Sequence, residues 1–490
     1  MIKPLRFTLT LGAALLVLAG CSVGPHYQRP AVDMPAAFKE ATLSPEAAQH
    51  WKDAQPADSM ERGRWWAVFG DASLDALEDQ AMAANQDLKA AAARVGQARA
   101  LRQGARSELF PRIDAGFGPT RQRASNASQG LPDDAANSPS TLWRAQAGVS
   151  YEADLFGRVA ADVDAATANA QQSQALFRSV QLALQADVAQ SYFLIRRLDA
   201  EQELYRGTVE LRSQTLDLVQ RRYAEGDISE LDVARAKTEL ASAQSESLGV
   251  DRQRAVAEHA LAILLGKAPA VFSVARQPLQ TVAVGIPAGL PSSLLERRPD
   301  IAAAERAMAA ANARIGAAKA AFFPRLNITG ALGYESSQLG DLFQWSSRTF
   351  LLGPLVGAML SLPIFDGGQR QAGLDRARAE YEEDVAIYRQ TVLNAFREVE
   401  DNLSSLRILG TQTEVQHAAV QSAARAADLS KTQYREGSIS YLDVIDADRA
   451  VLQQKRTAVQ LNGERAQAAV NLIRAIGGGW DHPHNAAADS

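Results

Sequence analysis

Side chains that usually carry catalysis or bind metals are scarce in this chain. Of 490 residues, six are histidine and one is cysteine. No two histidines have the spacing of metal ligands on one helix, and His482 and His484 lie in a polar tail that we expect to be unstructured. The sequence has no nucleophile elbow and no phosphate-binding glycine loop. These absences argue against an enzyme. The chain also lacks clusters of Met or His, the side chains that would bind soft metal ions.

The single cysteine suits acylation instead. Lys3 and Arg6 begin a segment that continues as an apolar stretch over 9–18 and ends in Leu-Ala-Gly-Cys at 18–21. This is the organisation of a signal peptide, and the last four residues resemble the bacterial lipoprotein box. We therefore predict a lipoprotein signal peptide over 1–20 and lipid attachment at Cys21, and Ser22 implies sorting to the outer membrane. An ordinary cleaved signal with an incidental cysteine is the alternative.

Composition narrows the class of protein. The chain holds 51 basic and 56 acidic residues, so its net charge of −5 gives no reason to expect a nucleic-acid partner. Aromatic residues are only 6%, which suits long helices better than a β-sandwich. After the signal segment, no apolar run approaches the roughly 20 residues of a membrane helix.

The sequence repeats itself once. The segment Tyr223–Val233 returns as Tyr434–Val444, 211 residues later, with the Tyr-x-x-Gly, Ile-Ser and Leu-Asp-Val elements kept. Phe110-Pro111-Arg112 likewise returns as Phe323-Pro324-Arg325. This period is far longer than that of solenoid repeats. We infer one duplicated structural unit, with repeats over 73–290 and 291–476, a leader over 21–72 and a polar tail over 477–490.

Proline placement predicts the helices. None occurs over 57–110, 140–268 or 364–482, and proline costs about 3 kcal/mol inside a helix. We expect helices over 157–226 and 367–437, each on the order of 100 Å long, with returning helices that end near 265 and 476. Shorter helices are expected over 73–108 and 299–321.

The repeated motif predicts a tight turn at 226–229 and at 437–440. Gly226 and Gly437 end the long helices, whereas Ser229 and Ser440 begin the returning ones. Each serine is followed three residues later by an aspartate, Asp232 or Asp443, which is the arrangement of a capping box.

Four segments favour strands. Apolar and polar residues alternate over about 111–120, 142–156 and 324–335, the pattern of an outer-membrane strand with one face toward lipid. The segment 351–365 alternates poorly and contains Pro354 and Pro363, so its assignment depends on the repeat. Four strands cannot close a barrel and open edges are excluded from hydrocarbon, which predicts oligomerisation. Three copies leave room for a lumen.

An ordered set of motifs resembles the TolC-type outer membrane factors, particularly the lipidated, OprM-like branch. The set includes Cys21 followed by Gly24–Pro30, then Trp65–Asp71, Ala84–Leu88 and Leu295–Ile301, and both Tyr-x-x-Gly turns. The resemblance implies a mainly α fold with a membrane β-barrel: a homotrimer with 12 strands, four per chain, continued by a periplasmic α-helical barrel. It also implies a mixed equatorial belt from the leader, 271–289 and the tail.

The same resemblance implies a passive exit duct of a tripartite efflux pump. The implied partners are a periplasmic adaptor and an inner-membrane transporter of the RND type, and no cofactor is implied. Two other functions stay open. One is the outer-membrane channel of a type I protein secretion system, and the other is a periplasmic coiled-coil structural lipoprotein.

The resemblance also assigns site residues. Two acidic positions after the second turn ring the closed aperture in the family, and they fall on Asp443 and Asp446. Helix capping is the alternative for Asp443, and a solvated helix face is the alternative for Asp446. The repeat equivalent of Asp446 is Arg235, so the charge has reversed between the halves. Relatives that carry an arginine two residues after the second turn glycine form a closing salt bridge there, which Ile439 cannot make.

Two further roles come from the resemblance. Tyr434 is expected to pack near Asp232 and to hold the closed state through a hydrogen bond, with a buried phenol as the alternative. The tip of the hairpins is the expected contact with the adaptor, and its residues also build the turns: Gly226, Ile228, Ser229, Gly437, Ile439 and Ser440.

Overall fold

The computed structural model describes residues 23–31, 35, 38–40, 63–123, 125–136, 138–279, 297–352 and 358–478. The predicted signal peptide 1–20, Cys21, the repeat boundary at 290 and the tail beyond 478 lie outside these residues. The described residues form two compact units. One includes Arg94–Ser173 and Ala304–Tyr388, and the other includes Gln174–Ala303 and Arg389–Ser490.

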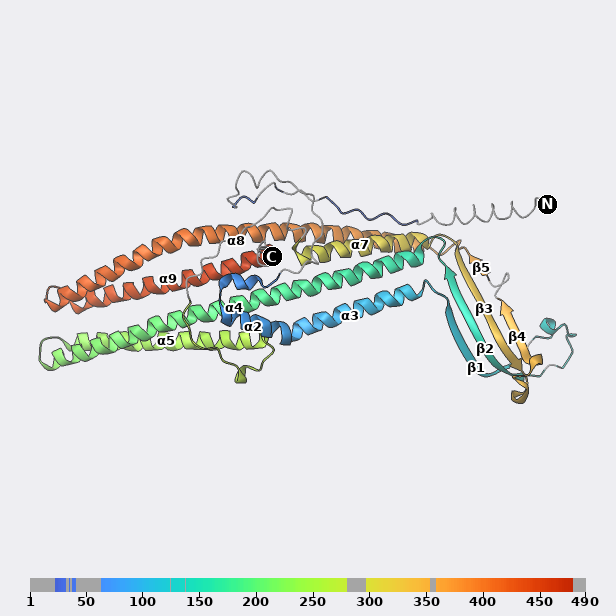
Figure 1. The fold of residues 1–490 in the computed structure, drawn as a ribbon, viewed down its shortest axis with the longest axis horizontal. Helices are drawn as coiled ribbons and strands as arrows, with labels where there is room; N and C mark the ends of the chain where they lie inside the picture. The colour runs from blue at the N-terminus through green and yellow to red at the C-terminus, as the bar shows by residue number, and fades with distance from the viewer. Residues whose placement is uncertain are drawn as a thin grey trace, which may run out of the picture. The chain divides into compact units, whose positions relative to one another are not determined.

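The same pair of helices occurs twice. Helix α4 spans Arg158–Ala224 and α8 spans Gln369–Arg435, 67 residues each, and they are followed by α5, Glu230–Leu264, and α9, Tyr441–Ala475, 35 residues each. Figure 1 shows α5 running back beside α4 and α9 beside α8. At 1.5 Å per residue, each long helix measures about 100 Å. Their continuity follows from sequences rich in alanine and free of proline.

The shorter helices differ in one respect from the prediction. The expected helix over 73–108 is two helices, α2 at Ala72–Ala84 and α3 at Gln86–Ser107, whereas α7 at Pro299–Ala320 is continuous. Asn85 makes the break. Its side chain accepts a hydrogen bond from the Leu88 N–H (2.9 Å) and donates one to the Leu264 carbonyl at the end of α5 (2.9 Å). The side chain thus competes for backbone groups that a continuous helix would use.

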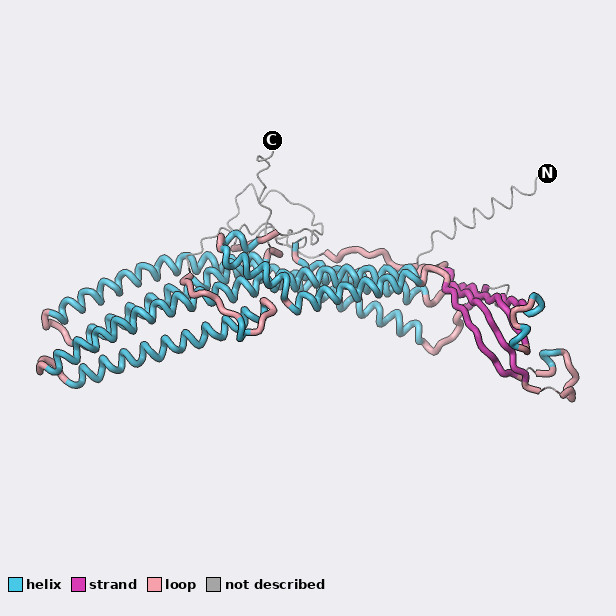
Figure 2. The backbone as a smooth tube through the Cα atoms, turned by 60° about the horizontal axis from the view of Figure 1, so that its bottom comes forward, coloured by secondary structure: helices cyan, strands magenta, loops and turns pink. Residues whose placement is uncertain are grey.

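Five strands form one antiparallel sheet, drawn in magenta in Figure 2. Strand β1 is Arg112–Gln122, β2 is Ser140–Ala153 and β3 is Arg325–Ser336. The fourth predicted strand, 351–365, is wrong as a single strand, because two short strands, β4 at Arg348–Leu352 and β5 at Ala358–Ser361, both pair with β3. Residues 353–357 lie outside the described part. The pairing register shows the break, because Leu352 lies opposite Gly330 whereas Ala358 lies opposite Ile328. Pro363, which cannot donate to a ladder, follows the end of β5.

The register separates the two faces of the sheet. Directly opposite residues share a face, so the pairs Ile113–Val149, Phe117–Ala145 and Leu332–Phe350 define an apolar face. The other face carries Arg112, Asp114, Gln146, Asn327 and Thr329, and its Arg144 pairs with the opposite Glu335 (Nε to Oε2, 2.8 Å). The period-two pattern therefore corresponds to a sheet that is apolar on one side and polar on the other.

Apolar residues from several elements form the largest core, which lies in the second unit. Trp65 and Trp66 in the 3-10 helix Trp65–Phe69 pack with Leu74 of α2, Tyr192 of α4 and Leu261 of α5. Within the described residues, no helix has both the length and the apolar character that crossing a membrane requires.

An ion-pair network fixes the segment after α5 to this core. Asp199 of α4 accepts from Arg254 of α5 (Oδ1 to Nε, 2.6 Å) and from the backbone N–H of Gln277 (3.1 Å). Arg196 donates to the Ala275 carbonyl (2.7 Å). This segment is the described part of the predicted belt over 271–289, and residues 280–289 lie outside the description.

Glu78 of α2 is a buried carboxyl. Its exposed fraction is 0%, and neither oxygen has a hydrogen-bond partner among the described residues. Burial, together with the smaller effect of the Asp79 and Asp75 carboxylates, raises the pKa of Glu78 from 4.5 to about 9. The group is therefore protonated at neutral pH.

This predicts that stability falls as the pH rises. The folded pKa lies above the unfolded value, so the contribution of Glu78 is fully present below pH 4.5 and is lost as the pH rises through about 9. At pH 7, which is 2.5 units above the unfolded pKa of 4.5, the accumulated loss is about 3 kcal/mol. We expect Glu78→Gln to flatten the decline of the apparent Tm between pH 5 and pH 9. The exposed Glu203→Gln is the control and should leave the decline unchanged. Parallel profiles for Glu78→Gln and the original chain would contradict the assignment.

Candidate functional site: the hairpin tip

Both helical hairpins turn in the same way. Gly226 and Gly437 have φ values of +82° and +75°, a conformation that side chains with a Cβ rarely adopt. The Asp227 N–H donates to the Arg222 carbonyl (2.9 Å), and the Ser438 N–H donates to the Gln433 carbonyl (2.9 Å). These hydrogen bonds, each between residues five positions apart at the end of a helix, are those of the Schellman motif. The two glycines thus end α4 and α8 by the same mechanism.

The helices that begin after the turns are capped differently. Asp443 accepts from the Ser440 N–H (3.0 Å) and from the Ser440 hydroxyl (2.7 Å), as in a capping box. Asp232 accepts from the Ser229 hydroxyl (3.0 Å) and lies 3.5 Å from the Arg235 guanidinium. The carboxylate of Asp443 is therefore used by its own helix, which supports the capping alternative for that residue.

Apolar side chains from both turns share one cluster. Val219 and Val233 of the first hairpin pack with Tyr441, Val444 and Ile445 of the second. Ile228, Tyr434 and Ile439 pack against this cluster and are partly buried. The two copies of the repeated motif, far apart in sequence, thus lie together at one tip.

Within the described residues, Tyr434 makes an aromatic contact and a cation–π contact but no hydrogen bond through its hydroxyl. Its ring centroid lies 5.6 Å from that of Tyr441, and the Arg222 guanidinium lies 5.3 Å from its centroid. Its hydroxyl is buried and has no hydrogen-bond partner among the described residues. The expected bond to Asp232 is thus not formed within this chain, because Asp232 is engaged by Ser229 and Arg235. Burial raises the pKa of Tyr441 to about 12, so this ring stays neutral.

Below the tip, Glu239 of α5 joins the two hairpins. It accepts from Arg212 of α4 (Oε2 to Nη2, 3.0 Å) and from Arg449 of α9. The Glu239 side chain is only 9% exposed. The hydrogen bond with Glu239 raises the pKa of Arg449. This carboxylate therefore bridges three helices through charge-assisted hydrogen bonds, which are stronger than neutral ones.

Asp446 lies at the end of this chain of charges. Its Oδ1 is 3.5 Å from Arg449 Nη1, and its side chain is 63% exposed. Arg235, its repeat equivalent, instead pairs with Asp232 one turn earlier. The charge reversal between the halves therefore accompanies a change of partner, and it leaves Asp446 with an accessible carboxylate.

The residues predicted for the gate, the closed-state contacts and the turns come together at the tip, whereas Cys21 lies outside the described residues. The sequence did not reveal the residues that join the two hairpins there. Glu239, Arg449 and Arg212 were missed, since each looks like a charge on a solvated helix face. Only the contact itself identifies them, and Glu239 and Arg449 are 210 positions apart in the sequence. A single sequence carries no signal of such a contact.

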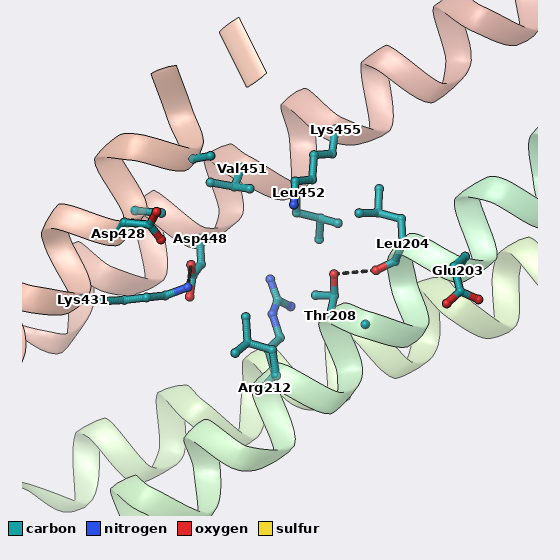
Figure 3. Close-up of a pocket in the computed structure, with 14 residues that line it drawn as sticks. Glu203, Leu204, Thr208, Arg212, Asp428, Lys431, Asp448, Val451, Leu452 and Lys455 are labelled. Carbon is teal, nitrogen blue, oxygen red and sulfur yellow. Dashed lines mark hydrogen bonds and ion pairs between the residues drawn. The ribbon is translucent and has the colours of Figure 1, made fainter. Parts of the chain in front are cut away.

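A cleft of about 360 Å³ lies between the hairpins next to this network. Figure 3 shows Arg212, Thr208 and Leu204 of α4 facing Lys431 of α8 and Asp448 of α9 across it. Lys431 pairs with Asp448 (2.8 Å), and Thr208 donates to the Leu204 carbonyl (2.9 Å). The lining is mixed and charged, which does not suit a small apolar ligand.

Removing the shared carboxylate tests the bridge. We expect Glu239→Gln to lower the apparent free energy of unfolding by about 1–3 kcal/mol, because two arginines lose their charged acceptor. Asp446→Asn breaks only the exposed 3.5 Å pair with Arg449 and should cost less than about 1 kcal/mol. Thermal denaturation of both variants measures the difference. Equal losses would show that Glu239 does not bridge the hairpins.

The sequence model of the family described as "Outer membrane efflux protein" matches residues 77–267 and 290–478. The toluene efflux pump outer membrane protein TtgI of Pseudomonas putida is 35% identical over 477 residues, which cover 96% of this chain and 98% of TtgI. The cation efflux system protein CusC of Escherichia coli is 33% identical over 468 residues, covering 95% and 97%.

Solved structures agree with these relatives. The open state of the Neisseria gonorrhoeae MtrE outer membrane channel superposes with a TM-score of 0.79 at 29% identity, covering 94% of this chain and 98% of MtrE. The prediction of a mainly helical fold that supplies an antiparallel sheet to a membrane barrel is confirmed. The family model covers both halves of the chain, which therefore belongs to the outer membrane efflux protein family and is an outer-membrane efflux channel.

Proposed function

We propose that three copies of this chain form the exit duct of a tripartite efflux pump. The observation that carries the proposal is the amphipathic sheet, whose outer strands are β1 on one side and β4 with β5 on the other. Their outer edges have no strand partner among the described residues of the chain. Such edges cannot face hydrocarbon, whereas pairing between copies removes them. Because β4 and β5 both pair with β3 and together take one position beside it, each chain supplies four strand positions. Three chains then make a 12-stranded barrel wide enough for a polar lumen, toward which Arg144, Glu335 and Thr329 would face.

The tip is the proposed gate. Three copies of Asp446 around one axis concentrate negative charge, which attracts cations and resists close approach of the chains. Exposure of the Asp446 carboxylate supports this role. For Asp443 we propose helix capping as the main role and gating as a secondary one, because its carboxylate already accepts a hydrogen bond from Ser440. Tyr434, Asp232 and Arg235 remain proposed closed-state contacts, made between copies.

The outer surface of the two turns is the proposed contact with a periplasmic adaptor. Ile228 and Ile439 pack inward against the tip cluster, so an adaptor would meet the backbone at Gly226 and Gly437, with Ser229 and Ser440 beside it. The adaptor would connect the duct to an inner-membrane transporter of the RND type, and acylation at Cys21 would add a lipid anchor in the outer membrane.

Small organic molecules are the proposed cargo. TtgI is named for toluene and CusC for cations, so the family relation alone leaves both open. Within the described residues, no group of three or more His, Cys, Asp or Glu side chains is placed to hold a metal ion. This favours organic solutes over a dedicated metal path, with selectivity set by the transporter upstream.

Conductance tests the gate. We expect Asp446→Ala to raise single-channel conductance and to lower cation preference in planar bilayers, because the field of the carboxylate ring is lost. Asp443→Ala added to it should raise conductance little more, while costing about 1 kcal/mol of stability through the lost cap. Asp217→Ala, which removes an exposed carboxylate from α4, is the control. Unchanged conductance and selectivity in the double variant would refute the gate.

Labelling tests the barrel. Single cysteines at Phe117 and Ile328, on the apolar face, should react with a lipid-soluble maleimide, whereas one at Thr329, on the polar face, should react with a water-soluble reagent added to the channel. The trimer should migrate as a heat-modifiable band. Reversed labelling, or a monomer in mild detergent, would contradict the proposed assembly while leaving the fold intact.

A further inference from the structure

The ends of the strands farthest from the helices are joined by two loops. Strands β1 and β2 are joined there by residues 123–139, and β3 and β4 by residues 337–347. The other ends of β1, β2 and β3 connect directly to α3, α4 and α7. Because the helices extend into the periplasm, the joined ends face the cell exterior and meet the outer leaflet of the membrane.

Two arginines lie on the apolar face of the sheet at this end. Arg121 lies eight residues after Ile113 and four after Phe117 on β1. An even spacing along a strand places side chains on the same face, so Arg121 shares theirs. Arg348 begins β4 directly opposite Tyr334, which is paired with Ala145 on the same face. A charged side chain on a lipid-facing surface is costly at the bilayer midplane but tolerated near the interface.

Aromatic rings lie at the same end of the sheet, and one of them contacts Arg348. Trp143 stacks on Phe117 with centroids 6.1 Å apart, and Phe343 packs edge-on against Tyr334 at 5.6 Å. The Arg348 guanidinium lies over the Trp345 ring, and its Nε donates to the Trp345 carbonyl (3.0 Å). Phe343 is 69% exposed and Trp345 is 77% exposed. Exposed rings at this depth are typical of a membrane interface.

The charges of these arginines are not neutralised within the described residues. Arg144 on the polar face pairs with Glu335, and Arg112 pairs with Asp114 (3.2 Å). Neither Arg121 nor Arg348 has a carboxylate within 4.0 Å in the described part of the chain. The nearby Asp341 accepts instead from Gln344 (2.6 Å). The polar face thus holds two internal ion pairs, whereas the two arginines of the lipid-facing rim have no carboxylate partner among the described residues.

We propose that this outer rim, made of Arg121, Arg348, Trp143, Tyr334, Phe343 and Trp345, binds the phosphate groups of the phosphorylated glycolipid (lipopolysaccharide) in the outer leaflet. The guanidinium fork matches phosphate oxygens in two hydrogen bonds, and the rings contact the acyl chains below the headgroup. Because β1 and β4 are the edge strands, Arg121 and Arg348 lie on either side of each seam between copies. This last point rests on the proposed trimer.

Binding of a defined lipid tests the proposal. The purified full-length channel in mild detergent is titrated with fluorescent bisphosphorylated lipid A. We expect Arg121→Gln or Arg348→Gln to weaken binding about fivefold each, and the double variant about 25-fold, since one arginine near an anionic surface contributes about that much. Added salt should weaken binding to the original chain more than to the double variant.

A matched control removes the same charge elsewhere. Arg102→Gln/Arg106→Gln in α3 should leave the affinity within twofold. Dephosphorylated lipid A should bind the original chain as weakly as bisphosphorylated lipid A binds the double variant, and 10 mM inorganic phosphate should not displace the lipid. Displacement by phosphate, an unchanged affinity of the double variant, or equal loss in the control would overturn the proposal.

Lipid A binding and trimer assembly are measured separately. Heat-modifiable migration and conductance are recorded for each variant, so a failure of the trimer is distinguished from a failure of lipid binding. If the double variant does not assemble, Trp345→Ser with Phe343→Ser in the loop replaces it and should weaken lipid A binding several-fold in an intact trimer. An intact trimer that binds lipid A with the original affinity would overturn the proposal.

Discussion

Backbone N–H and C=O groups on the outer edges of β1 and β4 need hydrogen-bond partners, and hydrocarbon supplies none. The alternation of apolar and polar side chains commits one face of the sheet to lipid, so water cannot satisfy the edges either. Pairing with further copies is the remaining solution. The proposed trimer, the lumen, the axis on which the tips converge and the seams between copies all follow from these unpaired edges.

The duplication provides two similar halves with different surroundings. Both hairpins end in the same Schellman turn at Gly226 and Gly437, and both place a serine before the returning helix. The halves differ in how charge is distributed after the turn. Arg235 is tied to Asp232 on its own helix, whereas Arg449 connects Asp446 to the buried Glu239 of the other hairpin. Shared residues build the turn, and diverged residues join the hairpins.

Helices rich in alanine pack closely but contribute little apolar area per residue. Between such helices, a few buried polar bridges fix the relative positions of neighbouring segments. Glu239 does so near the tip, and Asp199 does so where the segment after α5 crosses α4. A buried charge is costly unless it is paired, so each bridge favours one arrangement of the helices over sliding alternatives. Glu78 lacks such a partner among the described residues and stays protonated instead.

The sequence by itself determined the long helices, their turns and the alternating strands. These depend on local rules: proline-free alanine-rich runs, glycine at positive φ, serine followed by aspartate, and period two. Local rules failed where long-range contacts decide. Asn85 breaks a helix because its amide reaches Leu264 at the end of α5, and 351–365 is two strands because both pair with β3. The tertiary structure alone brings Glu239 to Arg449, leaves the Tyr434 hydroxyl unbonded within the described residues, and places Arg348 opposite Tyr334 on the apolar face of the sheet. Such contacts join residues that belong to different elements, and the free energy that selects them appears only when the elements pack.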